Sequence, residues 1–240
     1  MAKKQRLDKV LAHLGYGSRK EINRLCKGGL VTVDGEVIKS SSTHVDTENS
    51  IIKVGDEEIN YREFVYLMMN KPDGVISATE DSRHQTVVDL IDAEYRSFDV
   101  FPVGRLDIDT EGFLLLTNDG KLAHRLLSPK KHVPKTYYAH VEGKVTETDI
   151  EAFKRGVTLD DGYETKPGEL TILKSDTVSE IKLTIYEGKF HQVKRMFEAV
   201  DKKVVYLKRI SMGNLKLDEN LELGEYRELT EAELEILVNS

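Results

Sequence analysis

The residues best suited to chemistry lie in the segment FPVGRLDIDTEGFLLLTNDG, at positions 101 to 120. Asp107 follows a glycine-arginine turn and precedes the apolar run from Phe113 to Leu116. A short apolar run bounded by turn residues predicts a buried strand. A carboxylate in the loop before such a strand lies at the rim of a core, partly shielded from water yet accessible to a substrate. Asp107 is therefore a candidate nucleophile or base, and the alternative is an ordinary turn aspartate.

A second interpretation comes from the DxDT pattern formed by Asp107, Asp109 and Thr110. Phosphatases with an aspartate nucleophile use this pattern, with a magnesium ion that neutralises charge. Such an enzyme needs an apolar strand that runs directly into the first aspartate. Pro102 and Gly104 occupy that place here, and the apolar strand comes afterwards, so the sequence argues against a phosphatase.

The segment GRLDIDTEGFLLLTNDG resembles the signature of RNA pseudouridine synthases, and its GRLD form resembles the branch that acts on small-subunit ribosomal RNA. The resemblance continues through KTYYAHVEG (135–143), ETKPGELTIL (164–173) and GKFHQVKRMF (188–197). It implies an isomerase, without cofactor or metal, that detaches uracil from its ribose, rotates it and rejoins it through carbon rather than nitrogen.

The same resemblance implies roles for individual side chains. Asp107 is expected to act on a nucleotide flipped out of its stack, and Lys194 to hold this carboxylate ionised. Tyr137 is expected to stack on the uracil and to help remove the proton from carbon 5. Taken without the resemblance, such a tyrosine is more often a packing residue and such a lysine a solvated one. The candidate RNA contacts in this part of the chain are Arg105, Gln192 and Arg195.

Composition describes a globular protein of one medium domain with an appendage, or of two modest domains, since 39% of its 240 residues are hydrophobic and 32% charged. No apolar run approaches the roughly 18 residues of a membrane helix, and the start MAKKQRLDK lacks a secretory signal core. We therefore expect a cytoplasmic protein that does not bind membranes. Cys26 is the single cysteine, and the seven histidines show no HxH or HExxH spacing, so we expect neither a disulfide nor a metal site.

Charge is distributed unevenly along the chain. Residues 1 to 30 contain eight Lys or Arg and two acidic residues, so this segment carries +6 and the remainder −13 of the net charge of −7. Lysine and arginine that neutralise phosphates supply most non-specific affinity for nucleic acids. The basic segment of residues 1 to 30 therefore predicts local attraction of RNA, although a basic end can also be a solubilising surface.

The amino-terminal pattern is helix, helix and hairpin. Apolar spacing predicts a helix over residues 6–14, and a capping box of Ser18 with Glu21 opens a second helix that Gly28 ends. Asp34-Gly35 predicts a hairpin turn, and residues 51–54 a further strand. With RLDKVL, GSRKEI and VTVDGEVI, this pattern resembles the small RNA-binding domain shared with ribosomal protein S-four. By that resemblance the residues facing RNA phosphates are Arg6, Ser18, Arg19, Lys20, Arg24 and Lys27.

The remaining elements are expected to form a catalytic domain of α+β class with a mixed, mainly antiparallel sheet flanked by helices. We predict a polar linker over residues 56–63. The predicted strands cover residues 64–70, 113–116, 135–143 and 178–186. The predicted helices cover residues 86–91, 121–127, 146–155, a segment around 193–200 and a last one that a Thr230 and Glu233 capping box opens.

The sequence therefore predicts an S-four-type RNA-binding domain over residues 1–59 and a pseudouridine synthase domain over residues 60–240. The expected activity converts a specific uridine of 16S rRNA to pseudouridine, within a small-subunit assembly intermediate. Two alternatives stay open at this point: a pseudouridine synthase that acts on 23S rRNA, and a non-catalytic RNA-binding factor in ribosome assembly. A monomer is the default expectation.

Overall fold

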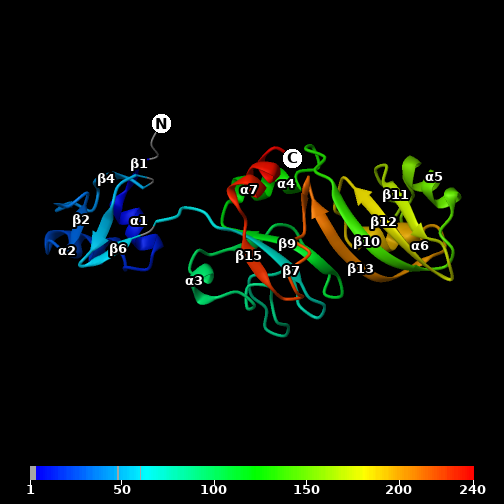
Figure 1. Cartoon of the computed structure of the whole chain (residues 1–240), viewed down its shortest axis with the longest axis horizontal. Helices are drawn as coiled ribbons and strands as arrows, with labels where there is room; N and C mark the ends of the chain where they lie inside the picture. The colour runs from blue at the N-terminus through cyan, green and yellow to red at the C-terminus, as the bar shows by residue number, and fades with distance from the viewer. Residues whose placement is uncertain (1–3, 48, 60) are drawn as a thin grey trace. The chain divides into compact units, whose positions relative to one another are not determined.

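The computed structural model describes residues 4–47, 49–59 and 61–240. The chain divides into two compact units, whose helices and strands are labelled in Figure 1. The first unit extends to Val65 and adds Ala93–Asp99, and the second comprises Tyr66–Asp92 and Val100–Ser240. The domain boundary expected between residues 59 and 60 stays a prediction, and residue 60 lies outside the described residues.

Both predicted helices of the first unit are confirmed. Helix α1 covers Leu7–His13 and helix α2 covers Arg19–Lys27. The Ser18 hydroxyl accepts a hydrogen bond from the backbone N–H of Glu21, and the Glu21 carboxylate accepts one from the backbone N–H of Ser18. These bonds satisfy N–H groups that a helix start leaves without partners, which is why α2 begins there.

Short strands complete the first unit. They are β1 (Lys4–Arg6), β2 (Val31–Val33), β3 (Glu36–Val37), β4 (His44–Asp46), β5 (Ile52–Val54) and β6 (Glu57–Ile59). β1 pairs with β4, and a second sheet has the order β3-β2-β5-β6. The predicted hairpin is confirmed, because Asp34 and Gly35 adopt positive φ of 53° and 83° between β2 and β3. Apolar residues of both helices and of these strands share one core, which includes Leu7, Leu11, Ile22, Cys26 and Ile52.

Two predicted features are wrong. Residues 56–63 are not a plain linker, because Glu57–Ile59 form strand β6 against β5; glutamates on this outer strand hide its pattern in the sequence. Residues 86–91 form a turn rather than a helix. The Thr86 hydroxyl accepts a hydrogen bond from the N–H of Asp89, and the Asp89 carboxylate accepts one from the N–H of Thr86, as in a capping box. The backbone bonds that follow join residues three apart, Asp89 to Thr86 and Ile91 to Val88, so the segment makes successive turns and no α-helix.

The second unit is built on one mixed sheet with the strand order β11-β12-β10-β13-β9-β7-β15 (Figure 1). These strands are β7 (Tyr66–Lys71), β9 (Glu111–Thr117), β10 (Lys135–Glu142), β11 (Glu169–Lys174), β12 (Val178–Ile185), β13 (Lys203–Met212) and β15 (Tyr226–Glu228). Two short strands join it: β8 (Phe101–Pro102) pairs with β9, and β14 (Leu215–Lys216) pairs with β13. The α+β class and the mainly antiparallel sheet are thus confirmed, and β9 with β13 form its parallel pair among the described residues.

The parallel pair joins the two halves of the sheet and brings two backbones unusually close. Gly112 of β9 pairs with Arg209 of β13 and has a φ of 99°. A Cβ atom at position 112 would lie 2.2 Å from the carbonyl oxygen of Arg209. Only glycine fits both this backbone conformation and this approach.

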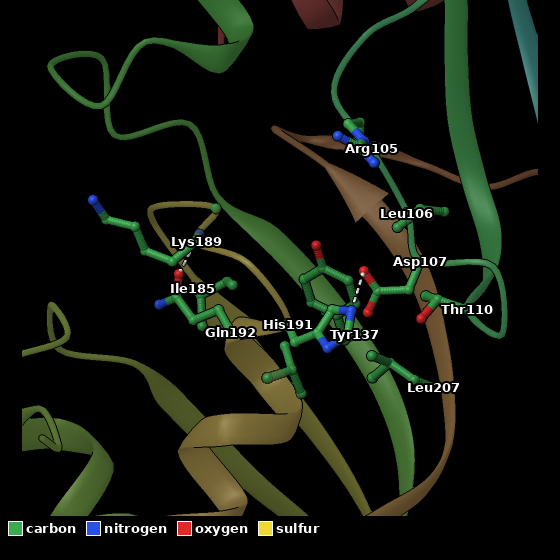
Figure 2. Close-up of a pocket in the computed structure, with 12 residues that line it drawn as sticks. Arg105, Leu106, Asp107, Thr110, Tyr137, Ile185, Lys189, His191, Gln192 and Leu207 are labelled. Atoms are coloured by element: carbon green, nitrogen blue, oxygen red, sulfur yellow. Dashed lines mark hydrogen bonds and ion pairs between the residues drawn. The ribbon is translucent and has the colours of Figure 1, made fainter. Parts of the chain in front are cut away.

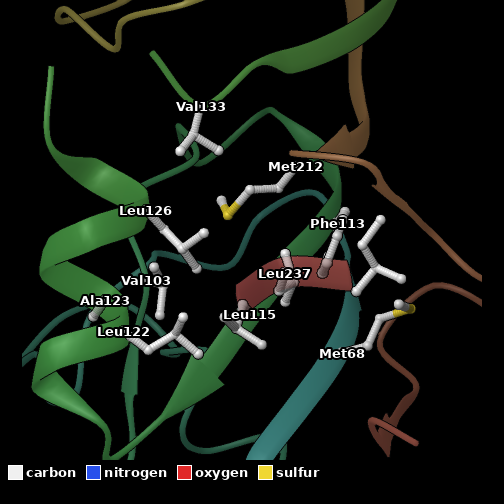
Figure 3. Packing of buried hydrophobic residues seen from close by; sticks show 11 residues of the cluster. Met68, Val103, Phe113, Leu115, Leu122, Ala123, Leu126, Val133, Met212 and Leu237 are labelled. Atoms are coloured by element: carbon white, nitrogen blue, oxygen red, sulfur yellow. The ribbon is translucent and has the colours of Figure 1, made fainter. Parts of the chain in front are cut away.

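Helices cover both halves of the sheet. α4 (Gly120–Leu127) and α7 (Glu231–Val238) contribute Leu122, Leu126 and Leu237 to the core that covers β7 and β9, as Figure 3 shows. α5 (Glu147–Arg155) and α6 (Gln192–Glu198) meet through Phe153 and Phe197, whose ring centroids lie 5.0 Å apart. A short helix, α3 (Ala93–Arg96), belongs to the first unit. No helix in the described part of the chain is long and apolar enough to cross a membrane.

Candidate active site

Asp107 lies in the loop between β8 and β9, and the segment after β7 holds this loop in place. The Ser77 hydroxyl donates to the carbonyl of Leu106 at 2.9 Å and accepts from the N–H of Leu106 at 3.0 Å. Lys71 is fully buried, and its Nζ donates to the carbonyl oxygens of Ile108 and Thr110, at 3.3 and 2.9 Å. The backbone on both sides of Asp107 is therefore fixed by side chains from another part of the chain.

Burial of Lys71 changes the pKa of its ammonium group. Removal from water is the largest influence on this ammonium group and lowers its pKa to about 8. The negative charges of Asp73 and Asp109 act in the opposite direction and raise the pKa, but by less. Hydrogen bonds to carbonyl oxygens replace the lost water, which allows a lysine to occupy this interior position.

The Asp107 carboxylate contacts two cationic or potentially cationic groups. Nζ of Lys194 lies 3.3 Å from its Oδ2, and Nε2 of His191 lies 3.5 Å from its Oδ1, the pair drawn as a dashed line in Figure 2. The Asp107 side chain is 26% exposed. The Asp107 carboxylate is thus positioned by contacts on both of its oxygens and is still partly open to the pocket.

Asp109 shares the same lysine. Nζ of Lys194 lies 2.6 Å from Oδ1 of Asp109, closer than it lies to Asp107. Although partial burial of Asp109 opposes its ionisation, the hydrogen bond and charge of Lys194 lower its pKa. Lys194 thus bridges two carboxylates, so it is held in place by a residue outside the predicted pair.

Tyr137 lies in the same pocket as Asp107. It is 8% exposed and projects from β10, and Figure 2 shows its ring beside the Asp107 carboxylate. Leu106, Ile185 and Leu207 supply apolar walls. The pocket therefore combines an aromatic face and aliphatic walls with a single carboxylate, which suits a flat ring presented next to that carboxylate.

The other residues predicted to contact RNA in this unit have different environments. Arg105 is exposed and stands at the pocket rim. Gln192 is 4% exposed, and its amide donates to Glu187 at 2.8 Å. The Arg195 side chain is 12% exposed and forms ion pairs with Asp160 and Asp161. Arg105 is thus available to a ligand. Gln192 lines the pocket, but its amide bonds within the protein, as does the Arg195 guanidinium.

The predicted RNA contacts of the first unit gather on and around α2. Exposed basic side chains follow its surface, namely Arg19, Lys20, Arg24 and Lys27. Ser18 is committed to capping the helix. Arg6 precedes α1 and donates to the Asp8 carboxylate at 2.6 Å, while its own side chain stays 47% exposed.

Sequence reasoning missed three residues that shape the site, Lys71, Ser77 and His191. The signal for His191 was its place in HQ-x-K, three residues before Lys194. Lys71 and Ser77 gave no local signal, because a lysine before proline is typical of a turn and a single serine between Ile76 and Ala78 has no distinctive spacing. Among the described residues no group of three or more His, Cys, Asp or Glu side chains is arranged to hold a metal ion.

Comparison with known proteins identifies both units. Residues 65–199 match the family model described as RNA pseudouridylate synthase, and residues 5–52 match that of the S4 domain. The chain is 58% identical over 233 residues to an uncharacterized RNA pseudouridine synthase of Bacillus subtilis, covering 97% of this chain and 98% of that protein. It is 40% identical over 234 residues to ribosomal small subunit pseudouridine synthase A of Escherichia coli, covering 97% of this chain and 100% of that protein.

A solved structure extends the comparison to the fold. A crystal structure of a pseudouridylate synthase superposes with a TM-score of 0.68 at 39% identity, covering 97% of this chain and 99% of the other. Because the match covers nearly the whole length of both chains, it extends over the S4 domain as well as the catalytic unit. The chain therefore belongs to the RNA pseudouridine synthase family, in the branch that carries an amino-terminal S4 domain, and it is an enzyme that isomerises uridine in RNA.

Proposed function

We propose that the protein converts a specific uridine of 16S rRNA to pseudouridine, with Asp107 as the catalytic carboxylate. The small-subunit preference is supported by relatives named ribosomal small subunit pseudouridine synthase A, which are 41% identical in Salmonella typhimurium and 40% in Escherichia coli. The substrate is a small-subunit assembly intermediate, and the protein acts in the cytoplasm as a monomer.

The observation that carries the catalytic assignment is the carboxylate of Asp107 in a pocket with Tyr137, held by Lys194 at 3.3 Å. A uridine in a helix or stack keeps its glycosidic bond and its C5–C6 edge away from such a recess. The nucleotide must therefore leave the stack before Asp107 can reach it. Arg105 at the rim is placed to occupy the space that the uracil leaves, or to bind the backbone beside it.

The chemistry exchanges a carbon–nitrogen bond for a carbon–carbon bond, and it removes one proton from carbon 5 while nitrogen 1 takes one up from solvent. The bond from ribose carbon 1 to uracil nitrogen 1 breaks, the ring turns within the pocket, and carbon 5 bonds to carbon 1 and loses its proton. Asp107 acts as nucleophile or base in this sequence. Tyr137 stacks on the ring, and its hydroxyl helps to remove the proton from carbon 5.

The α2 surface serves a separate purpose in this proposal. Its exposed cations, Arg19, Lys20, Arg24 and Lys27, bind RNA phosphates, with arginine able to do so bidentately. Phosphate contacts position an RNA without reading its sequence, so the selection of one uridine belongs to the catalytic unit and the RNA fold.

Replacement of the catalytic carboxylate tests the assignment. Asp107→Asn keeps the side-chain shape and removes the charge, so release of tritium from carbon-5-labelled uridine should stop while RNA binding persists. Asp109→Asn is the matched control, because it removes the other carboxylate bonded to Lys194 and should leave substantial turnover. Turnover by the Asp107→Asn variant near the wild-type rate would overturn the assignment.

Mapping of modified nucleotides tests the substrate. In rRNA from cells that lack the protein, one pseudouridine of 16S rRNA should be absent, and it should return when the wild-type gene is restored but not with Asp107→Asn. Loss of a 23S rRNA pseudouridine instead would replace the small-subunit proposal with the large-subunit alternative.

A further inference from the structure

Phe190 is an exposed aromatic residue at the edge of the catalytic pocket. Its exposed fraction of 74% is the highest among the large hydrophobic side chains that the structure describes. The neighbours on both sides, Lys189 and His191, line the pocket. A single exposed apolar side chain needs no explanation by itself, so what matters is how this one is held and what lies around it.

The ring of Phe190 stacks on His191, and His191 in turn reaches the catalytic carboxylate. The two ring centroids lie 3.7 Å apart with an interplanar angle of 18°. Nε2 of His191 is 3.5 Å from Oδ1 of Asp107. One face of the Phe190 ring is therefore covered by the imidazole, and its high exposure leaves the opposite face open beside the pocket.

The loop that carries Phe190 is fixed to α6. The Gln192 side chain accepts a hydrogen bond from the N–H of Lys189 at 2.9 Å and donates to buried Glu187. Arg195 donates to the carbonyl oxygen of Phe190 at 3.3 Å and is itself paired with Asp161 at 2.7 Å. The exposed ring therefore stands on a bonded loop, and a preformed surface loses little conformational entropy when it binds a partner.

The backbone conformation at His191 also indicates that this loop is preformed. His191 has a φ of 49°, in the left-handed region that non-glycine residues seldom adopt. The structure maintains this conformation at the position that stacks on Phe190 and contacts Asp107. Unusual backbone conformations gather at sites where the surrounding structure fixes a functional arrangement.

An enzyme that extracts a nucleotide leaves the bases on either side without a stacking partner on one face. An open aromatic ring next to the extraction pocket can replace that partner, whatever the identity of the base. Basic side chains nearby, Lys189 and Arg105, are both exposed and suit the phosphates of such a strand. We infer that Phe190, supported by His191, stacks on the base adjacent to the target uridine and holds the RNA open during the reaction. This inference rests on the proposed position of the uridine at Asp107.

A comparison of base-deleted substrates tests the stacking directly. The RNA is a fragment with the uridine that the wild-type protein converts, made with its neighbours intact, or with the base removed from the 5′ or from the 3′ neighbour. Phe190→Ala should lower kcat/KM on the intact RNA by about 5- to 150-fold, mostly through KM, as expected for loss of one stacked base. On the RNA that lacks the stacked base, wild type and Phe190→Ala should have equal kcat/KM.

Matched variants separate stacking from a general effect on the fold. Phe190→Trp should restore turnover on intact RNA, because it keeps an aromatic face. Leu173→Ala removes an exposed apolar side chain from β11, outside the pocket, and should behave as wild type. Undiminished kcat/KM of Phe190→Ala on intact RNA, or an equal loss on all three RNAs, would overturn the inference. Either result leaves the Asp107 assignment standing if Asp107→Asn is inactive, so the two proposals fail separately.

Discussion

Replacement of Gly112 by alanine should destabilise the catalytic unit at the junction of β9 and β13. The backbone at Gly112 has a φ of 99°, and a side chain in this kind of conformation costs about 1–2 kcal/mol. The added methyl group would also lie 2.2 Å from the Arg209 carbonyl oxygen, and 2.9 Å from the N–H nitrogen of the same residue. Such overpacking costs about 1–3 kcal/mol more. The expected loss in the free energy of unfolding is therefore about 2–5 kcal/mol.

Gly162 offers a control in the same unit. Its φ is 81°, but nothing lies within 4 Å of a Cβ placed there. Gly162→Ala should therefore lose only the conformational part, about 1–2 kcal/mol. Any gain from a less flexible unfolded chain applies to both variants and cancels in the comparison. Urea unfolding followed by circular dichroism measures the difference, since the chain has no tryptophan to report by fluorescence.

Turnover should separate the same two variants. Asp107 lies in the loop before β9, and Tyr137 lies on β10, which pairs with β13. If the methyl group pushes β9 away from β13, it also moves the Asp107 carboxylate away from the Tyr137 ring. A misplacement of about 1 Å between such groups can lower the rate about 100-fold. Gly162→Ala should keep its activity. If the two variants lost the same stability and Gly112→Ala released tritium at the wild-type rate, the close approach of Gly112 to the Arg209 backbone would not be a structural requirement.

Two further predictions concern Tyr137 and Lys71. Tyr137→Phe should bind RNA as wild type does, and Tyr137→Ala should bind about 1–3 kcal/mol more weakly because the stacking face is lost; equal binding by all three proteins in a titration would make Tyr137 a packing residue. The pKa of Lys71 falls from 10.5 to about 8 on folding, so between these pH values the unfolded chain holds more protons and stability rises with pH. The rise should be about 3 kcal/mol for this group, with a similar one from Lys135, whose pKa also falls to about 8 on burial. Urea unfolding of both proteins across this range should show the stability difference between wild type and Lys71→Met growing by about 3 kcal/mol, and a constant difference would contradict the burial of the Lys71 charge.

Much of the architecture could be predicted because its signals are local. The capping boxes at Ser18 and Thr230, the Asp34-Gly35 turn and the apolar run of β9 each depend on residues a few positions apart. Strand β13 was not predicted, because lysine and arginine interrupt its apolar pattern. Arg209 nevertheless has 2% exposure, as its Nε donates to the carbonyl oxygen of Phe113 on the neighbouring strand. A contact across 96 residues of chain leaves no trace in the local sequence.

In the candidate site, too, local motifs could be predicted and long-range contacts could not. The motifs pointed to Asp107, Tyr137 and Lys194, and the fold places Asp107 within reach of the other two. The ion pair between Asp109 and Lys194 could not be predicted, since it depends on how α6 approaches the β8 to β9 loop. Lys71 was equally hidden, because only the folded chain turns a lysine at the end of β7 into a buried donor for that loop.

The position of β13 determines when the site can form during synthesis. This strand lies between β10 and β9, although it follows both of them in the chain. Before residues 203–212 leave the ribosome, β7 and β9 carry Asp107 in one incomplete sheet, and β10 to β12 carry Tyr137 in another. The S4 unit, with a core drawn from residues 7 to 61, can complete most of its packing long before then. A nascent chain can therefore complete the S4 unit early, whereas the pocket that we propose as catalytic forms only after residues 203–212 are available to pair with β9 and β10, so a chain that ends before these residues should bind RNA without modifying it.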